Sequence, residues 1–123
     1  MAENHLSMPP SVAHPLLSAE VAQARAYQLD AVRAGLGANT LLVLPTGTGK
    51  TPIAWMVVAE RLREMREIYD SSSSKRNCPW ILMVAPTNPL VVQHHRDATT
   101  WLELGEGEIV ALTGKITPEK RQP

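Results

Sequence analysis

Residues 40–51, which decide how the chain folds, read Thr40-Leu41-Leu42-Val43-Leu44-Pro45-Thr46-Gly47-Thr48-Gly49-Lys50-Thr51. The first part is a short apolar run that a proline closes, which is typical of a strand buried on both faces. Two glycines then allow consecutive backbone N–H groups to turn into one cavity, and a helical pattern follows directly. Because a helix N-terminus carries partial positive charge, the stretch predicts a binding site for an anion.

Lys50 and Thr51 narrow the kind of anion. A lysine at this place can reach the β- and γ-phosphates of a nucleoside triphosphate, and the threonine hydroxyl can bind a Mg²⁺ ion that also holds phosphate oxygens. The usual phosphate-loop pattern begins with glycine, whereas this chain has Leu44 there, so the match rests on the glycine pair, the lysine and the threonine. The alternative, a glycine turn that merely contains a lysine, fits the apolar run before it and the helix after it less well.

The hydrophobic pattern predicts alternating helices and strands around this turn. Helices are expected over about Tyr27–Ala34, over about Ile53–Ile68 and from Pro89 onward with Asn88 as its cap; strands are expected at Thr40–Leu44, Trp80–Ala85 and Glu108–Leu112. The second helix is apolar all round in its first half and should lie deep there. Strands that alternate with helices imply right-handed crossovers and a parallel sheet, so the predicted fold class is α/β.

Composition and charge exclude several classes of protein. The chain has 123 residues, and its 12 Lys and Arg balance 12 Asp and Glu. No global basic field attracts nucleic acid or a membrane, so any nucleic-acid contact must be local. The longest apolar run, Ile53–Ala59, is far shorter than the roughly 20 residues that span a bilayer. The N-terminus lacks a signal-peptide pattern, so we expect a cytosolic protein without membrane contact.

Three further segments suggest ligand contacts. Gln28, in Arg25-Ala26-Tyr27-Gln28, precedes Lys50 by 22 residues, and a glutamine amide can pair with the edge of adenine while Tyr27 supports the ring. The segment from Ala85 to Gln93 combines a strand end, a hydroxyl and a helix start, which suits a backbone phosphate, and Leu112-Thr113-Gly114 offers a similar seat. Taken alone, each segment also fits an ordinary capped or amphipathic helix start.

Together with the glycine-rich stretch, these segments resemble four motifs that superfamily 2 helicases carry in the same chain order. Residues 25–28 resemble the Q motif, residues 44–51 motif I, residues 85–93 motif Ia and residues 112–114 motif Ib. His14-Pro15-Leu16-Leu17, together with residues 109–114 and 117–121, looks more narrowly like the archaeal Hef and Fanconi-anaemia M group. Members of that group are helicases and translocases of forked and branched DNA. The resemblance covers about residues 14–121.

The resemblance implies ATP and Mg²⁺ as cofactors and DNA as partner, contacted mostly through its backbone. ATP is expected at Arg25, Tyr27, Gln28, Pro45, Thr46, Gly47, Thr48, Gly49, Lys50 and Thr51. Lys50 and Thr51 are the catalytic residues in this set, and Thr51 also binds Mg²⁺. DNA is expected at Pro86, Thr87, Asn88, Gln93, Thr113 and Gly114. In a bacterium or archaeon such a protein belongs in the cytoplasm, and in a eukaryote in the nucleus.

The resemblance also implies a fold and what is missing from it. We expect an extended arm over residues 1–19, followed over 20–123 by the N-terminal half of a RecA-like, three-layer P-loop NTPase domain with a parallel sheet. No Asp-Glu pair occurs, so the domain lacks its acidic motif II strand. We therefore expect the N-terminal fragment of a helicase, which alone hydrolyses ATP poorly. Two alternatives stay open: a non-catalytic nucleotide-binding remnant, and the motor part of a restriction-type translocase.

Overall fold

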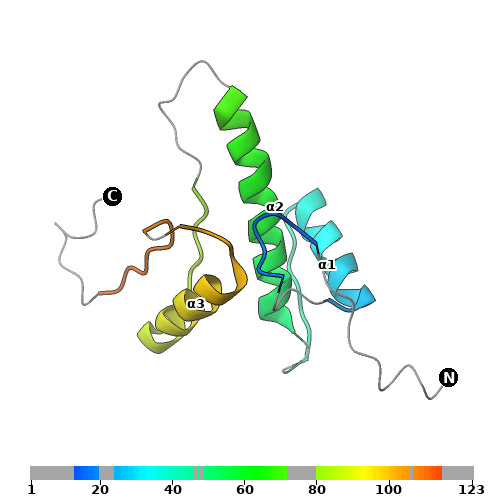
Figure 1. Cartoon of the computed structure of the whole chain (residues 1–123). Coiled ribbons are helices and arrows are strands. Elements are labelled where there is room, and N and C mark those ends of the chain that lie inside the picture. The colour runs from blue at the N-terminus through cyan, green and yellow to red at the C-terminus, as the bar shows by residue number, and fades with distance from the viewer. Residues whose placement is uncertain are drawn as a thin grey trace.

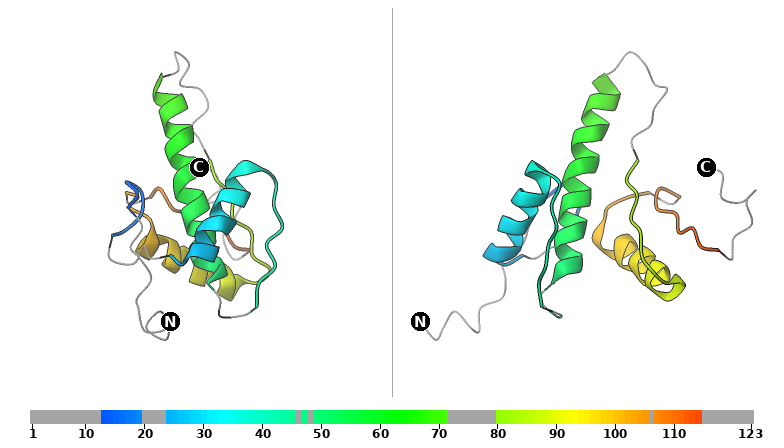
Figure 2. Two further views of the ribbon diagram at one scale, coloured as in Figure 1. Left: turned by 90° about the vertical axis from the view of Figure 1, so that its right-hand side faces the viewer. Right: turned by 180° about the vertical axis from the view of Figure 1, so that it is seen from behind.

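Three helices form the framework of the part of the chain that the structure describes. The computed structural model describes residues 13–19, 24–45, 47, 49–71, 80–105 and 107–114. Within these ranges the helices are α1 (Ala26–Gly37), α2 (Lys50–Ser71) and α3 (Asn88–Trp101). All three predicted helices are thereby confirmed. The long helix α2 stands between α1 on one side and α3 on the other (Figures 1 and 2).

The predicted parallel sheet is absent from the described residues, where Thr40–Leu44, Trp80–Ala85 and the described segment 108–112 carry no strand. The prediction that Thr40–Leu44 is buried on both faces is wrong, because Leu41 is 89% and Val43 is 80% exposed. Leu42 and Leu44 between them are half-buried against the helices. The segment thus keeps the alternation of a strand, but none of the described residues forms a neighbouring strand whose N–H and C=O groups could complete a ladder.

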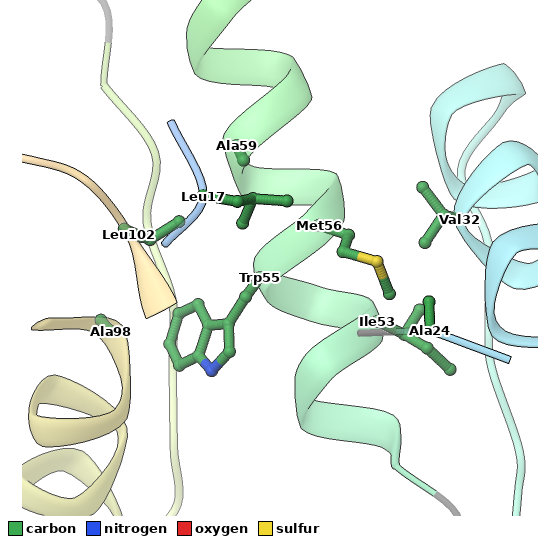
Figure 3. Close-up of a cluster of buried hydrophobic side chains, with 9 residues drawn as sticks. All are labelled: Leu17, Ala24, Val32, Ile53, Trp55, Met56, Ala59, Ala98 and Leu102. Atoms are coloured by element: carbon green, nitrogen blue, oxygen red, sulfur yellow. The ribbon is translucent and has the colours of Figure 1, made fainter. Parts of the chain in front are cut away.

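The hydrophobic core lies on two sides of α2 (Figure 3). On one side the buried residues are Ile53 and Met56 of α2 with Ala24 and Val32; on the other they are Trp55 and Ala59 of α2 with Leu17, Ala98 and Leu102. This arrangement confirms that the first half of α2 lies deep. Because α2 contributes to both sides, it is the element on which the other segments assemble.

The start of α3 differs from the prediction by one residue. Thr87, not Asn88, is the N-cap, and its side-chain oxygen accepts a hydrogen bond from the Leu90 N–H at 3.4 Å. A cap side chain accepts from the second or third amide of its helix, and Pro89 at the second position has no N–H to donate. Asn88 is therefore the first helical residue, and its side chain is not needed for capping.

Residues 13–19, the described part of the expected arm, pack on the same core as the helices. The Ser18 N–H donates to the Trp101 carbonyl, and the Glu103 N–H donates to the Leu16 carbonyl, both at 2.8 Å. These bonds flank an antiparallel bridge between Leu17 and Leu102. The segment therefore joins the end of α3 to α2.

His14 fastens this segment to the middle of α2. Its Nε2 lies 2.8 Å from Glu60 Oε2, while its Nδ1 accepts the Leu16 N–H at 3.1 Å. The Nε of Arg63 also donates to both Glu60 oxygens, at 3.1 and 3.2 Å. The hydrogen bond from Arg63 lowers the pKa of Glu60 to about 2 from its usual 4.5; burial opposes this effect, and the His14 bond adds to it.

This lowered pKa predicts a loss of stability in acid. A carboxyl whose pKa is lower in the folded than in the unfolded state stabilises the fold above the unfolded value, and this contribution disappears as the pH falls from about 4.5 to about 2. Because both partners are partly exposed, we expect roughly 1 kcal/mol. Urea denaturation at pH 6 and pH 3 should show this loss in the wild type and not in Glu60→Gln. The control Glu67→Gln, which removes a largely exposed carboxylate 3.0 Å from Arg63, should keep the pH dependence. Equal pH dependence in Glu60→Gln and the wild type would contradict the assignment.

Candidate nucleotide and nucleic-acid sites

The glycine-rich turn has the backbone geometry that its sequence predicts. Gly47 and Gly49 adopt left-handed φ angles of 82° and 86°, which side chains with a Cβ rarely tolerate. The helix α2 begins at Lys50, directly after the second glycine. Lys50 and Pro45 are exposed, and Thr51 is half-buried. Thr46 and Thr48, also predicted to bind ATP, lie outside the described residues. The described part of the turn therefore places a helix N-terminus and a lysine side by side.

Gln28 contacts this turn across 21 residues of sequence. It is 7% exposed, and its Nε2 donates a hydrogen bond to the Gly49 carbonyl at 3.2 Å. Its Oε1 accepts the Arg25 N–H at 2.8 Å, so that the same side chain also holds the start of α1. The structure thus brings the predicted adenine-reading residue to the phosphate loop. Each end of its amide makes a hydrogen bond within the protein, but an amide has two N–H donors and two acceptor lone pairs, so contact with adenine does not require these bonds to break.

A groove of about 550 Å³ runs along the same side of α2. The segment 38–42 and α1 form its other walls, and Lys50 and Arg61 bring two cationic side chains to it. Arg61 is held in place by the Leu36 carbonyl and by Glu64. Arg25 and Tyr27 are exposed at the start of α1 and do not line this groove. Lys50 is therefore the residue that the turn and the groove share.

A second hollow joins the two segments predicted to contact nucleic acid. It measures about 260 Å³ and is lined by Ala85, Asn88, Val91, Leu112, Thr113 and Gly114. Three predicted residues, Asn88, Thr113 and Gly114, thus face one space although the chain separates them by about 25 residues. Pro86 and Thr87 adjoin it in sequence and are exposed, whereas Gln93 is exposed and does not line it.

Two histidines of α3 contact other parts of the protein, and the sequence pattern did not identify the partner of either. The ring of His94 meets that of Trp55 edge to face, with centroids 6.3 Å apart. The neighbouring His95 places its Nε2 3.2 Å from the Ile109 carbonyl. Adjacent residues on a helix point in different directions, so the sequence indicates that the two histidines face different surroundings. It does not indicate which residues they contact.

The close approach of Gln28 predicts the effect of adding a methyl group to the turn. A Cβ at Gly49 would overlap the Gln28 Nε2 and would require a side-chain residue at positive φ. We therefore expect Gly49→Ala to lower the free energy of unfolding by about 1–2 kcal/mol. Denaturation in urea measures this loss. Gly37→Ala, at the end of α1 with open space around its Cβ position, is the control and should be neutral or stabilising. Equal stabilities of the two variants would argue against the contact.

Comparison with known proteins assigns the chain to a family. Residues 25–122 match the model of the DEAD/DEAH box helicase family. The match covers most of the chain and includes the turn, the Gln28 contact and both walls of the second hollow. The chain therefore belongs to the DEAD/DEAH box helicase family, and this membership implies a RecA-like P-loop fold and the use of ATP.

Its relatives include archaeal and eukaryotic helicases. The Methanocaldococcus jannaschii protein MJ1505, which carries the name of an ATP-dependent RNA helicase, is 39% identical over 110 residues, which are 89% of this chain and 13% of the relative. The ATP-dependent DNA helicase MPH1 of Pyricularia oryzae is 34% identical over 98 residues, 80% of this chain and 8% of the relative. The Fanconi anemia group M protein homolog of mouse is also 34% identical over 98 residues, 80% of this chain and 4% of the relative. The chain thus spans 13% or less of each of these relatives.

No solved structure matches the chain. In the part of the chain that the structure describes, none of the helices combines the length and apolar character that crossing a membrane requires.

Proposed function

We propose that this chain supplies the ATP site and the first DNA contacts of an ATP-dependent helicase or translocase that acts on forked or branched DNA. The observation that carries the proposal is the hydrogen bond between Gln28 Nε2 and the Gly49 carbonyl, because it joins the Q motif to the phosphate loop. The names of two relatives support DNA as the substrate, since one is a DNA helicase and the other a Fanconi anemia group M protein homolog, whereas the archaeal relative carries the name of an RNA helicase. Such a protein works in the cytoplasm of an archaeon or bacterium, or in a eukaryotic nucleus.

The residues of the turn fit a triphosphate. The left-handed conformations of Gly47 and Gly49 turn the backbone toward α2, and the space around the Cβ position of Gly47 is open among the described residues. The N-terminus of α2 can offer phosphate oxygens the amides of its first turn, which have no partner within the helix. Thr46 and Thr48 belong to the same loop in the family pattern. The Lys50 ammonium balances the charge of the β- and γ-phosphates. Pro45 precedes the loop and ends the segment that leads into it.

The adenine base of ATP binds at the start of α1 in this proposal. Gln28 can keep its bond to the Gly49 carbonyl and pair with the adenine edge through the second N–H of its amide, and Arg25 and Tyr27 lie exposed beside it. A Mg²⁺ ion would be held by the Thr51 hydroxyl together with phosphate oxygens, and when bound it supplies charge neutralisation during phosphoryl transfer. Lys50 and Thr51 are the residues of this chain that act at the reacting phosphates.

DNA binds at the second hollow through its backbone. Because Thr87 caps α3, the side chain of Asn88 is not needed as the cap. Its amide can therefore donate a hydrogen bond to a phosphate oxygen in the hollow that Thr113 and Gly114 also line. Pro86 and Gln93 extend the contact along the exposed start of α3. Contacts with the DNA backbone do not depend on the base sequence, which suits a protein that recognises the shape of a fork. Because the net charge of the chain is zero, DNA binding depends on this local site and not on a general positive charge.

Fluorescence anisotropy of a labelled DNA fork tests this site. We expect the affinity to fall as salt rises, since phosphate contacts release counterions. Asn88→Ala should weaken binding about tenfold, because it removes a hydrogen bond to a charged group. Asn39→Ala, which removes the same amide from the groove beside α1, should bind as tightly as the wild type. Unchanged binding by Asn88→Ala, or preference for an RNA duplex of the same sequence, would contradict the DNA assignment.

A further inference from the structure

Helix α2 carries one contact that connects the two proposed ligand sites. It begins with Lys50 at the phosphate loop, and Trp55 follows five residues later, about 7.5 Å further along the helix axis. The Trp55 side chain is 3% exposed and points from α2 toward α3 (Figure 3). There it meets His94, which lies six residues after Asn88, the DNA-site residue at the start of α3.

The polar atoms of these two rings are buried and complementary. Among the residues that the structure describes, neither Trp55 Nε1 nor His94 Nδ1 has a hydrogen-bond partner. The indole N–H can only donate, and a neutral imidazole nitrogen can accept. An unpaired buried polar atom is unfavourable, so a shift of α3 against α2 that brings the two atoms together lowers the free energy of the pair. The edge-to-face arrangement of the structure leaves both atoms unpaired, whereas a hydrogen-bonded arrangement of the same two rings would pair them.

Two further links transmit such a shift to the walls of the DNA site. His95, next to His94, contacts the Ile109 carbonyl, and the segment that follows leads to Thr113 and Gly114. Arg66 of α2 donates to Glu108 at 2.8 Å, which ties α2 to the same segment. Because Arg66 holds this segment to α2, a movement of α3 against α2 would change the spacing of Asn88 from Thr113 and Gly114.

We infer that Trp55 and His94 are positioning residues through which ATP binding at the phosphate loop and DNA binding at the second hollow influence each other. The inference rests on the proposed function, which supplies both ligands. ATP contacts the first turn of α2 and DNA contacts the first turn of α3, so each ligand acts on one partner of the ring pair. Coupling between two sites requires an element with two arrangements that both ligands bias, and the ring pair is that element.

The test measures how much each ligand changes the affinity for the other. Anisotropy of a labelled DNA fork gives the DNA affinity with and without a non-hydrolysable ATP analogue, and titration of a fluorescent ATP analogue gives the reverse. Both ratios must agree, because coupling is reciprocal. We expect a ratio of about tenfold for the wild type, within the range usual for linked sites.

Four variants separate coupling from structure. Trp55→Phe and His94→Phe keep an aromatic ring but cannot form the hydrogen-bonded arrangement, and both should bring the ratio to within about twofold of one. His94→Gln restores an acceptor and should recover most of the ratio. Trp101→Phe removes a half-buried indole elsewhere on α3 and should change nothing. A purely structural role would lower single-ligand affinities and leave the ratio intact.

The outcomes distinguish this inference from the proposed function. If the wild type binds both ligands without coupling, or if His94→Phe and His94→Gln have the wild-type ratio, the inference is overturned while the proposed function stands. If the wild type binds neither ligand, both are overturned. The comparison of the two His94 variants also decides the matter if Trp55→Phe fails to fold, because they differ only at one side chain of α3.

Discussion

Replacing Lys50 by alanine should weaken ATP binding by about 10- to 100-fold. The ammonium group makes charge-assisted bonds to the phosphates that are worth about 1.5–3 kcal/mol, and every 1.4 kcal/mol is a factor of ten in affinity. Lys50 is exposed at the start of α2, so its removal should leave the stability of the fold nearly unchanged. Titration of a fluorescent ATP analogue measures the effect directly.

A matched variant distinguishes this contact from a general effect of charge. Arg33→Ala also removes one positive charge, but from the exposed face of α1, where Arg33 pairs only with Asp30 among the ion pairs described. It should bind ATP as the wild type does, since an exposed pair of this kind contributes little. Equal affinities of Lys50→Ala and the wild type would remove the lysine from the ATP site and with it the phosphate-loop assignment.

Trp55→Ala should cause the largest loss of stability, about 3–5 kcal/mol. The indole is 3% exposed and fills the space between α2, α3 and residues 13–19, so truncation leaves a cavity that three elements border. Urea denaturation should show a lower midpoint with a similar dependence on urea.

Trp80→Ala provides the control for this loss. Trp80 is 68% exposed at the start of the segment that precedes α3, so deletion of its indole should change stability by no more than about 0.5 kcal/mol. If both variants were equally stable, the interface between α2 and α3 would not hold the fold together, and the route from Trp55 to His94 would lose its basis.

Several features followed from local sequence because local physics determines them. The three helices were predictable from apolar spacing, and the deep position of Ile53–Ala59 from a helix that is apolar on every side. Left-handed φ angles at Gly47 and Gly49 were predictable because glycine alone adopts them without strain. The cap of α3 was misplaced by one residue, since threonine and asparagine both serve as caps and only the geometry selects between them.

The sequence by itself therefore determined the helices, the glycine turn and the helicase family, since each depends on residues that are neighbours in the chain. Only the tertiary structure decided the rest. Strand patterns at Leu41 and Val43 form no ladder in the described residues because a strand needs a second segment to complete its hydrogen bonds. The bond from Gln28 to Gly49, the hollow shared by Asn88 and Gly114, and the meeting of Trp55 with His94 all join residues that are distant in sequence. Such contacts are set by how helices pack around α2, and no local pattern encodes that packing.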